Sequence, residues 1–202
     1  MAVRDHSLDR KIEEAATAEF MEHGFRSASL RKIAARAGIT TGALYTRYKN
    51  KDVLFTTLVE SALQEVGRGL EPIHEQYLQA LESRDPDRIL AVIRREEEIY
   101  LHILFEYYEP CILFFCRSDG SAVQKKLQQM MEQKAKKTVA CFRSIARQEV
   151  ELDGVELILA EQFHYYRRVL EQGMTREKAV SSMKTVETFL EAGWRDLFRR
   201  ML

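Results

Sequence analysis

A glycine turn between two short helical patterns constrains the fold of this chain more than any other feature of its sequence. The first pattern follows Ser29, a residue type that caps helix N-termini, and its apolar members are Leu30, Ile33 and Ala34. The second follows Thr40 or Thr41 and stops near Tyr48. Gly38 lies between them, where a residue without a Cβ can adopt the positive φ of a tight connection. The sequence therefore predicts two short helices joined by a turn, the helix-turn-helix arrangement.

The rest of the chain also carries apolar residues at helical spacing, and no segment alternates as a β-strand would. The 202 residues include only 9 Gly and 3 Pro, which favours long helices. The expected helices are a bracing helix at 8–20 and later ones at 51–66, 72–82, 87–108, a short one from 110, then 121–151, 155–171 and 176–200. The helix that begins at Lys51 loses definition near Gly67 and Gly69, where we expect a domain junction. The prediction is an all-α fold.

Positive charge is concentrated in the segment of the glycine turn, although the formal charge of the whole chain is zero. Between His23 and Lys51 there are seven Lys or Arg residues and no acidic residue. Lys and Arg displace counterions from phosphates, so such a concentration in a neutral protein indicates a local site for a polyanion. The alternative is a basic face that is only solvated.

An extended sequence motif of a known protein family covers about the first quarter of the chain, and nearly all of its characteristic positions are present. Its residues are Ile12, Ala15, Ala16, Phe20, Gly24, Phe25, 29–34, 37–45 and 48–54. At these residues the sequence resembles the TetR/AcrR family of transcriptional regulators. Two positions differ, because the family often has histidine at Arg47 and phenylalanine at Tyr48. The change at Tyr48 is mild, whereas Arg47 adds a cation that can alter phosphate contacts or sequence preference.

The resemblance implies how the chain is divided and what it binds. It implies a three-helix DNA-binding domain at residues 1–52, followed by a larger helical domain for effector binding and dimerisation at 53–202. It also implies a symmetric homodimer that binds a palindromic operator in double-stranded DNA. In the family, a small ligand in the C-terminal domain typically spreads the two reading heads and releases the DNA.

The resemblance also implies the DNA contacts, residue by residue. The expected base readers are Leu30, Arg31, Thr40, Thr41, Gly42, Ala43 and Tyr45. The expected phosphate contacts are Ser29, Thr46, Arg47, Tyr48, Lys49 and Lys51. Short hydroxyls suit phosphates or base edges, and Gly42 and Ala43 allow the helix backbone to approach closely. The alternative for Leu30, Ala43 and Leu44 is packing between the helices, and Tyr45 could also belong mainly to the core.

The last two predicted helices carry apolar residues on more than one face. One face can pack inside the subunit while another meets a partner, so two helices from each subunit would form a four-helix homodimer interface. This arrangement is also usual in the family. The alternative is a helix pair buried wholly in its own monomer.

An aromatic and strongly apolar region is the candidate for an effector site. The expected ligand-binding residues are Tyr100, Leu104, Tyr107, Tyr108, Phe114, Phe115 and Phe142, which suit a small apolar or aromatic effector. The alternative is an aromatic core without a cavity. Charged residues interrupt the run from Ile99 to Cys116, so we expect a buried helical region and no membrane anchor.

Other chemistry finds little support in the sequence. Cys111, Cys116 and Cys141 have neither zinc-site nor redox-pair spacing, so we expect buried structural thiols, with a thiol sensor as the alternative. The N-terminus lacks the apolar stretch of a signal peptide, which predicts a cytoplasmic protein. No phosphate loop, metal motif or nucleophile–base arrangement is present, so we expect no cofactor, no metal site and no enzyme. His102 and Glu106, one helical turn apart, come nearest to an acid/base pair.

Two questions of regulation stay open at this stage. We favour a repressor because repressors are usual in the family that the sequence resembles, although activators bind DNA in the same way. The main alternative function is a helix-turn-helix regulator that a protein partner controls, without a small-molecule pocket.

Overall fold

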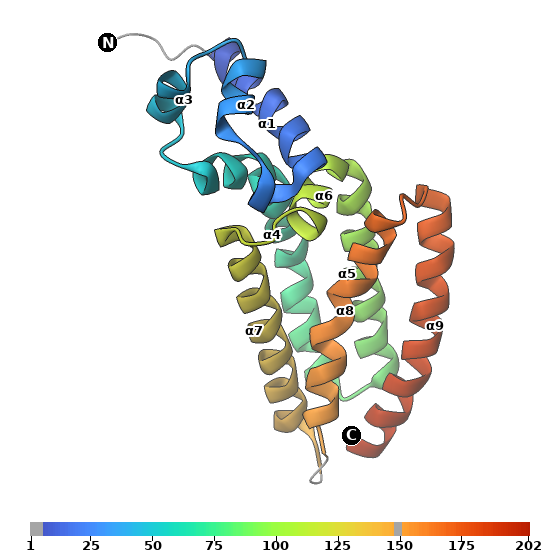
Figure 1. The fold of residues 1–202 in the computed structure, drawn as a ribbon. Coiled ribbons are helices and arrows are strands. Elements are labelled where there is room, and N and C mark those ends of the chain that lie inside the picture. Colours follow the sequence, from blue (N-terminus) through green and yellow to red (C-terminus); the bar gives the residue numbers. More distant parts are fainter. Residues whose placement is uncertain (1–5, 148–150) are drawn as a thin grey trace. The chain divides into compact units, whose positions relative to one another are not determined.

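The computed structural model describes residues 6–147 and 151–202, and every regular element within these ranges is an α-helix (Figure 1). This confirms the predicted all-α fold. The helices form two compact units. The first contains the chain up to residue 63 together with 107–127, and the second contains 64–106 together with 128–202. Each unit has its own apolar core.

The first unit is built around three aromatic rings. Its helices are α1 (His6–Ser27), α2 (Leu30–Arg36), α3 (Thr41–Arg47), the start of α4 (Lys51–Ser83), α6 (Tyr108–Cys116) and the start of α7 (Ala122–Ile145). Phe20 is fully buried, and its ring meets the Phe55 ring edge-on at 4.9 Å between centroids. Phe25 packs on the same ring at 5.2 Å. The apolar face of α1 thus covers the start of α4.

The segment 107–127 completes the core of this first unit. Leu113 from α6 and Val123 from α7 are buried in it. The backbone N–H of Phe25 donates to the carbonyl of Arg117 at 2.8 Å, and an Asp52 carboxylate oxygen accepts from the N–H of Ala122 at 2.6 Å. The first unit therefore includes residues that lie far along the chain. The boundary between a DNA-binding domain at 1–52 and an effector-binding domain at 53–202 stays a prediction.

The helix caps expected at Ser29 and at Thr40 or Thr41 are confirmed, the second at Thr40, and the structure has further caps of the same kind. The side chains of Ser29, Thr40 and Thr175 cap α2, α3 and α9 (Arg176–Met201) by accepting backbone N–H groups of the first turn. Asn50 likewise accepts from the N–H of Val53 at 2.8 Å. Gly38 has the positive φ expected of the turn, at 72°. The caps and the turn fix where α2 and α3 begin, and hence which side chains each presents.

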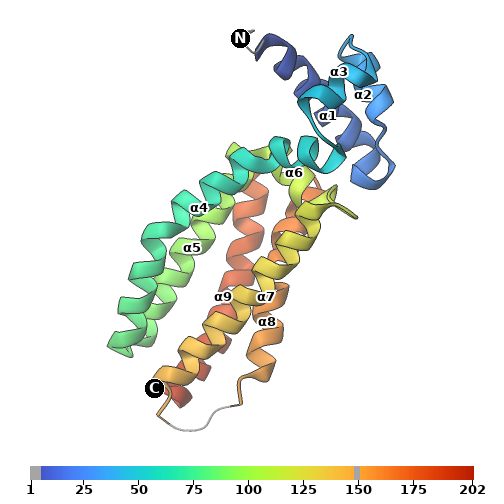
Figure 2. The same cartoon turned by 90° about the vertical axis from the view of Figure 1, so that its left-hand side faces the viewer.

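The second unit is a bundle of five helical segments that run alongside one another (Figures 1 and 2). They are α4 from residue 64, α5 (Pro86–Glu106), α7 from residue 128, α8 (Asp153–Glu171) and α9. Phe142, Trp194 and Phe198 form an aromatic cluster in its core, with 5.3 Å between the centroids of Phe142 and Phe198.

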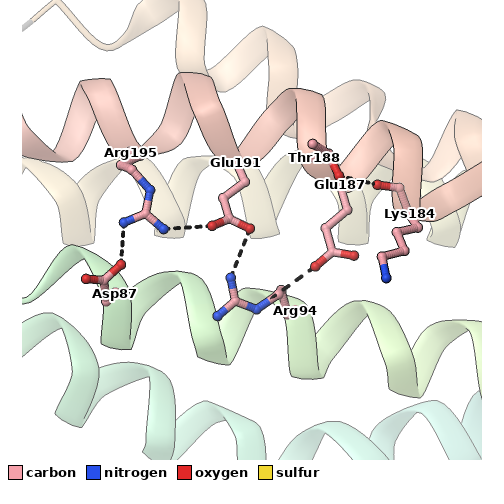
Figure 3. Close-up of polar contacts among 7 residues, drawn as sticks. All are labelled: Asp87, Arg94, Lys184, Glu187, Thr188, Glu191 and Arg195. Carbon is pink, nitrogen blue, oxygen red and sulfur yellow. Dashed lines mark hydrogen bonds and ion pairs between the residues drawn. The ribbon is translucent and has the colours of Figure 1, made fainter.

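Charged side chains link α5 to α9 along the outside of this bundle (Figure 3). Arg94 donates to Glu191 at 2.9 Å and lies 4.0 Å from Glu187. Arg195 bonds both Glu191 and Asp87. These groups are partly exposed, so each pair contributes modestly to stability and weakens in salt. As a network they fix the register of α9 along α5.

The predicted end of the helix near Gly67 and Gly69 is wrong, because α4 continues through both glycines and through Pro72 to Ser83, although the two compact units divide within α4 between residues 63 and 64. Buried or half-buried apolar residues keep a helical spacing across this stretch, from Leu70 through Ile73. Continued burial of one face outweighs the low helix propensity of glycine and the bond that proline removes.

Further boundaries also differ from the prediction, beginning with the helix expected at 8–20, which spans His6–Ser27. The helix expected at 87–108 ends at Glu106, and α6 begins at Tyr108. The helix expected at 121–151 ends at Ile145, because the N–H of Arg147 donates to the carbonyl of Met201 rather than within the helix. The expected end of that helix, 148–150, lies outside the described residues. The helix expected from 155 begins already at Asp153, since buried Leu152 supplies the first carbonyl acceptor of α8.

The two glycines of α4 allow a matched stability prediction. A Cβ at Gly67 would meet nothing within 4 Å, so Gly67→Ala should raise the free energy of unfolding by about 0.5–1 kcal/mol. A Cβ at Gly69 would lie 2.9 Å from the Ile99 Cγ2 and 3.6 Å from the Ile103 Cδ1 of α5. Gly69→Ala should therefore be less stable than Gly67→Ala by about 1–3 kcal/mol. Urea unfolding followed by circular dichroism measures both variants, and equal gains would show that α5 does not need Gly69.

Among the described residues, no single helix has both the length and the apolar composition that a membrane span needs. The helices α5 and α6, separated by a sharp break, have both only when they are counted together.

Candidate nucleic-acid interface and cavity

The short helix α3 presents one side to the core and the other to solvent. Leu44 is buried in the first unit, whereas the neighbouring Tyr45 is 51% exposed. Thr40, Gly42 and Thr46 are exposed as well. The Thr46 hydroxyl donates to the carbonyl of Gly42 at 3.0 Å, which fixes its rotamer on the helix surface. The outer side of α3 therefore carries a phenol, hydroxyls and an uncovered stretch of backbone.

Exposed cations accompany this surface. Arg31, Lys32, Arg36 and Lys49 are exposed, and none of them forms an ion pair with another described residue. Unpaired cations are available to phosphates without breaking an internal contact. Lys32 and Arg36 are missing from the predicted contact residues, although the acid-free basic segment contained the signal for both.

Arg47 and Tyr48, two predicted phosphate contacts, are occupied inside the first unit. Arg47 forms an ion pair with Asp9 in which both side chains are largely buried. Tyr48 is only 4% exposed, and its hydroxyl donates to the carboxylate of Glu13 at 2.9 Å. Both contacts fasten the end of α3 to α1, so the structure gives these side chains a positioning role. Their partners lie 38 and 35 residues earlier, beyond the reach of a local motif.

Lys51 has a mixed position. Its ammonium donates to the carbonyls of Arg26 at 3.1 Å and Ala28 at 2.9 Å, and it lies 4.8 Å from the centre of the Phe25 ring. Burial lowers the pKa of this ammonium, against the attraction of Asp52 and Glu19. An ammonium has three N–H donors, so the two carbonyls leave one for a phosphate.

The remaining predicted contacts lie at helix starts or are half-buried. Ser29 caps α2, and its backbone N–H donates to the carboxylate of Glu19 at 3.0 Å. Leu30 packs on the apolar core. Thr41 and Ala43 are half-buried in the first turn of α3. These four residues place the two helices, whatever further contacts they make.

The second unit contains a cavity of about 380 Å³ lined by all five of its helical segments. Of the predicted ligand-binding residues, Tyr100 and Phe142 line this cavity. Leu104 is buried in the same unit but does not line it. The other four predicted residues lie in the first unit: Tyr107, Tyr108, Phe114 and Phe115. The aromatic run from Ile99 to Cys116 is thus divided between two cores.

Most residues that line the cavity are not among the ligand-binding residues predicted from the sequence. Tyr77, Glu96, Lys134 and Trp194 all line it, each from a different helix. Along α7, the lining residues Met130, Lys134, Thr138 and Cys141 recur every three or four positions. That spacing was readable as one helix face, but it gave no indication that the face borders a cavity.

An ion pair lies in the cavity wall. Lys134 bonds the carboxylate of Glu96, lies 3.3 Å from the hydroxyl of Tyr100, and stands 5.1 Å from the centre of the Tyr100 ring. Burial raises the pKa of Tyr100 well above its ordinary value, and the charge of Glu96 adds to this effect. A water-sized space of about 20 Å³ adjoins the pair beside Glu97. Burial raises the pKa of Glu97 to about 7, with repulsion from Glu187 and Glu96 contributing.

The cysteines form no disulfide in the structure. Cys111 is buried, and burial raises the pKa of its thiol to about 12, with the neighbouring Cys116 adding to the shift. The Cys111 thiol is therefore protonated at neutral pH, a form that reacts poorly. Among the described residues, no three His, Cys, Asp or Glu side chains gather as a metal site.

Comparison with known proteins gives this geometry a context. The profile of the family described as bacterial regulatory proteins, tetR family, matches residues 12–58. The chain is 37% identical over 84 residues to YhgD of Bacillus subtilis, an uncharacterized HTH-type transcriptional regulator, covering 37% of this chain and 44% of that protein. It is also 37% identical over 67 residues to the HTH-type transcriptional repressor SCO4008 of Streptomyces coelicolor, covering 33% of this chain and 35% of that one. The chain thus spans less than half the length of these relatives that it matches.

Similarity of the fold extends further than similarity of sequence. A crystal structure of a TetR-like transcriptional regulator from Rhodococcus sp. RHA1 matches with a TM-score of 0.63 and 20% identity, covering 97% of this chain and 98% of that one. The relatives found by sequence are named as regulators, not as enzymes. Residues 12–58 thus match the model of the tetR family of bacterial regulatory proteins, and the all-helical fold is similar to that of a TetR-like regulator.

Proposed function

We propose that the chain is a sequence-specific DNA-binding transcriptional regulator that binds a palindromic operator with α2 and α3. The observation that carries this proposal is the exposed side of α3 together with the unpaired cations Arg31, Lys32, Arg36 and Lys49. A helix of this size enters a major groove, where Tyr45 and the threonine hydroxyls reach base edges and phosphates. Lys51 contributes its remaining N–H at the start of α4.

The regulator acts as a homodimer through α8 and α9. Phe189 on α9 is 80% exposed and Leu157 on α8 is 71% exposed, although each helix also has a buried face. Large apolar side chains so exposed on adjacent elements are typical of a protein interface. A twofold dimer would present two reading heads to operator half-sites one helical turn, roughly 34–36 Å, or a multiple of that, apart.

Control comes from a small ligand in the cavity of the second unit, and the regulator is a repressor. A cavity of about 380 Å³ lies within the size range of ligand pockets, and its mixed apolar and polar lining suits a small molecule. The name of the relative from Streptomyces coelicolor, a transcriptional repressor, supports the direction of control. Ligand binding would lower DNA affinity and release the regulated gene.

A second candidate is a helix-turn-helix regulator that a protein partner controls. The exposed apolar side chains of α8 and α9 favour it, because they could receive another protein instead of a second copy. The cavity favours control by a ligand over this second candidate.

A salt titration of DNA binding tests the proposal directly. Fluorescence anisotropy compares the duplex just upstream of the chain's own gene with a scrambled duplex, across a range of salt concentrations. We expect tight, selective binding by a dimer, with an affinity that falls steeply as salt rises. If genomic fragments and ligand-stripped protein gave only weak binding indifferent to sequence, the proposal would fail and the partner-controlled candidate would replace it.

A further inference from the structure

The cavity of the second unit has walls that are mainly apolar and aromatic. Each of the five helices contributes such a residue: Ile73, Ile93, Phe142, Leu159 and Trp194. An apolar cavity of about 150 Å³ accommodates one benzene ring. The 380 Å³ available here therefore accommodates an aromatic ring with an aliphatic chain of several carbons.

The cavity opens to solvent between α4 and α7. The exposed members of its lining come from these two helices and include Leu78 and Met130. Lys137 and His74 are exposed in the same region. The Lys137 ammonium and the His74 ring stay in contact with water, so both are weak determinants of what enters.

The interior charges of the cavity neutralise each other. Glu96 and Lys134 are the half-buried charged residues of the lining, and they bond directly. Lys134 is held further by the Tyr100 hydroxyl and lies 5.7 Å from the centre of the Phe163 ring. A charged ligand would lose water without gaining a free counter-charge, unless it broke this pair. Glu97, the nearby buried carboxyl, lies outside the lining of the large cavity.

Uncharged polar groups, in contrast, are available to a ligand. The side chains of Tyr77, Thr138 and Gln162 line the cavity and form no hydrogen bond with other described residues. No fully buried polar side-chain atom of the described residues lacks a partner, so these groups reach the open space of the cavity. Burial, with smaller effects from Cys141 and Glu96, raises the pKa of Tyr77, which keeps the phenol a neutral donor.

We infer that this cavity selects uncharged molecules that combine an aromatic or aliphatic body with a hydroxyl or carbonyl group, and that the Glu96–Lys134 pair excludes ions. The polar group of the ligand meets the Tyr77 and Thr138 hydroxyls or the Gln162 amide, while its body lies against Phe142 and Trp194. The inference rests on the proposed function, in which this cavity is the effector site. It adds the chemical class of the effector and the residues that determine it.

The test uses three probes that share one apolar body and differ in the terminal group, which is neutral, negative or positive. Each has a phenyl ring on a six-carbon chain, which ends in a hydroxyl, a carboxylate or an ammonium group. Trp194 is the single tryptophan of the chain and lines the cavity, so its fluorescence reports occupancy. Calorimetry on the full-length protein gives the same affinities independently.

Wild-type protein should bind the hydroxyl probe at least about tenfold more tightly than either ion. In Glu96→Gln, Lys134 loses its counter-charge, so the carboxylate probe should gain about tenfold over its wild-type affinity while the hydroxyl probe changes little. The double variant Glu96→Gln with Lys134→Met is uncharged again and should restore the wild-type order. Lys137→Gln serves as the control, because an exposed lysine should not change that order.

The outcomes separate the inference from the function on which it rests. Equal affinities for the three probes, no binding of any probe, or an unchanged order in Glu96→Gln would each overturn the inference. If the double variant fails to fold by circular dichroism, Glu96→Gln alone decides. These titrations contain no DNA. A probe that binds with the expected charge order but leaves DNA affinity unchanged would therefore contradict only the ligand-responsive part of the proposed function.

Discussion

Replacing Arg31, Lys32, Arg36 and Lys49 together by glutamine should abolish specific DNA binding near physiological salt. All four side chains are exposed and form no ion pair with described residues, so the fold does not need their charges. If half of them contact phosphate, a dimer loses four such contacts, and the slope of log affinity against log salt becomes shallower by about 3.6. We expect a loss of affinity of at least about a thousandfold, measured by anisotropy against the operator.

A matched variant distinguishes the position of these charges from their number. Lys125, Lys126, Lys136 and Lys184 are also exposed and lie outside α2 and α3. Replacing these four by glutamine changes the net charge equally, but it should reduce DNA affinity by less than about tenfold, since only long-range attraction is lost. Similar losses in both variants would mean that net charge, and not the surface of α2 and α3, governs binding.

Phe189→Glu should convert the proposed homodimer into a monomer. The side chain is 80% exposed, so the substitution costs the monomer fold almost nothing. In a twofold interface the change occurs twice, and two desolvated carboxylates would replace two aromatic contacts. The dimer dissociation constant should rise by at least about a hundredfold, which sedimentation or light scattering measures. Operator binding should fall with it, because two linked heads bind far more tightly than one.

Val53→Glu is the control for this second substitution. Val53 is also exposed and apolar, but it lies in the first turn of α4, where a carboxylate is well tolerated. Its dimer should be unaffected. A Phe189→Glu protein that remains a dimer would place the interface elsewhere and would favour docking of another protein on α9.

Features encoded within a few residues were predictable from the sequence. The caps at Ser29 and Thr40 and the positive φ of Gly38 depend on local backbone geometry, and the structure has all of them. The same locality explains why the all-α fold and the helix-turn-helix were predictable.

Features that depend on distant partners were not predictable in this way. Arg47 and Tyr48 look like DNA contacts in the motif, but Asp9 and Glu13 hold them inside the first unit. The helix α4 continues through its glycines because one of its faces stays buried, and α5 approaches Gly69 closely. The cavity requires five helices to be placed at once, so no single helix pattern revealed it.

The helix-turn-helix of this protein does not form a packing unit by itself. The core of the first unit includes Leu113, Phe114 and Val123, which come from the later segment 107–127. In addition, an Asp52 carboxylate oxygen accepts the backbone N–H of Ala122 at the start of α7. A recombination event that exchanged only the N-terminal coding region between relatives would pair a foreign α1 with a native 107–127 segment. Successful exchange of operator specificity therefore requires either substitutions confined to the exposed side of α2 and α3, or joint inheritance of both stretches. Selection on the helix-turn-helix therefore also acts on residues 107–127, although in the sequence these residues lie between two segments of the second unit.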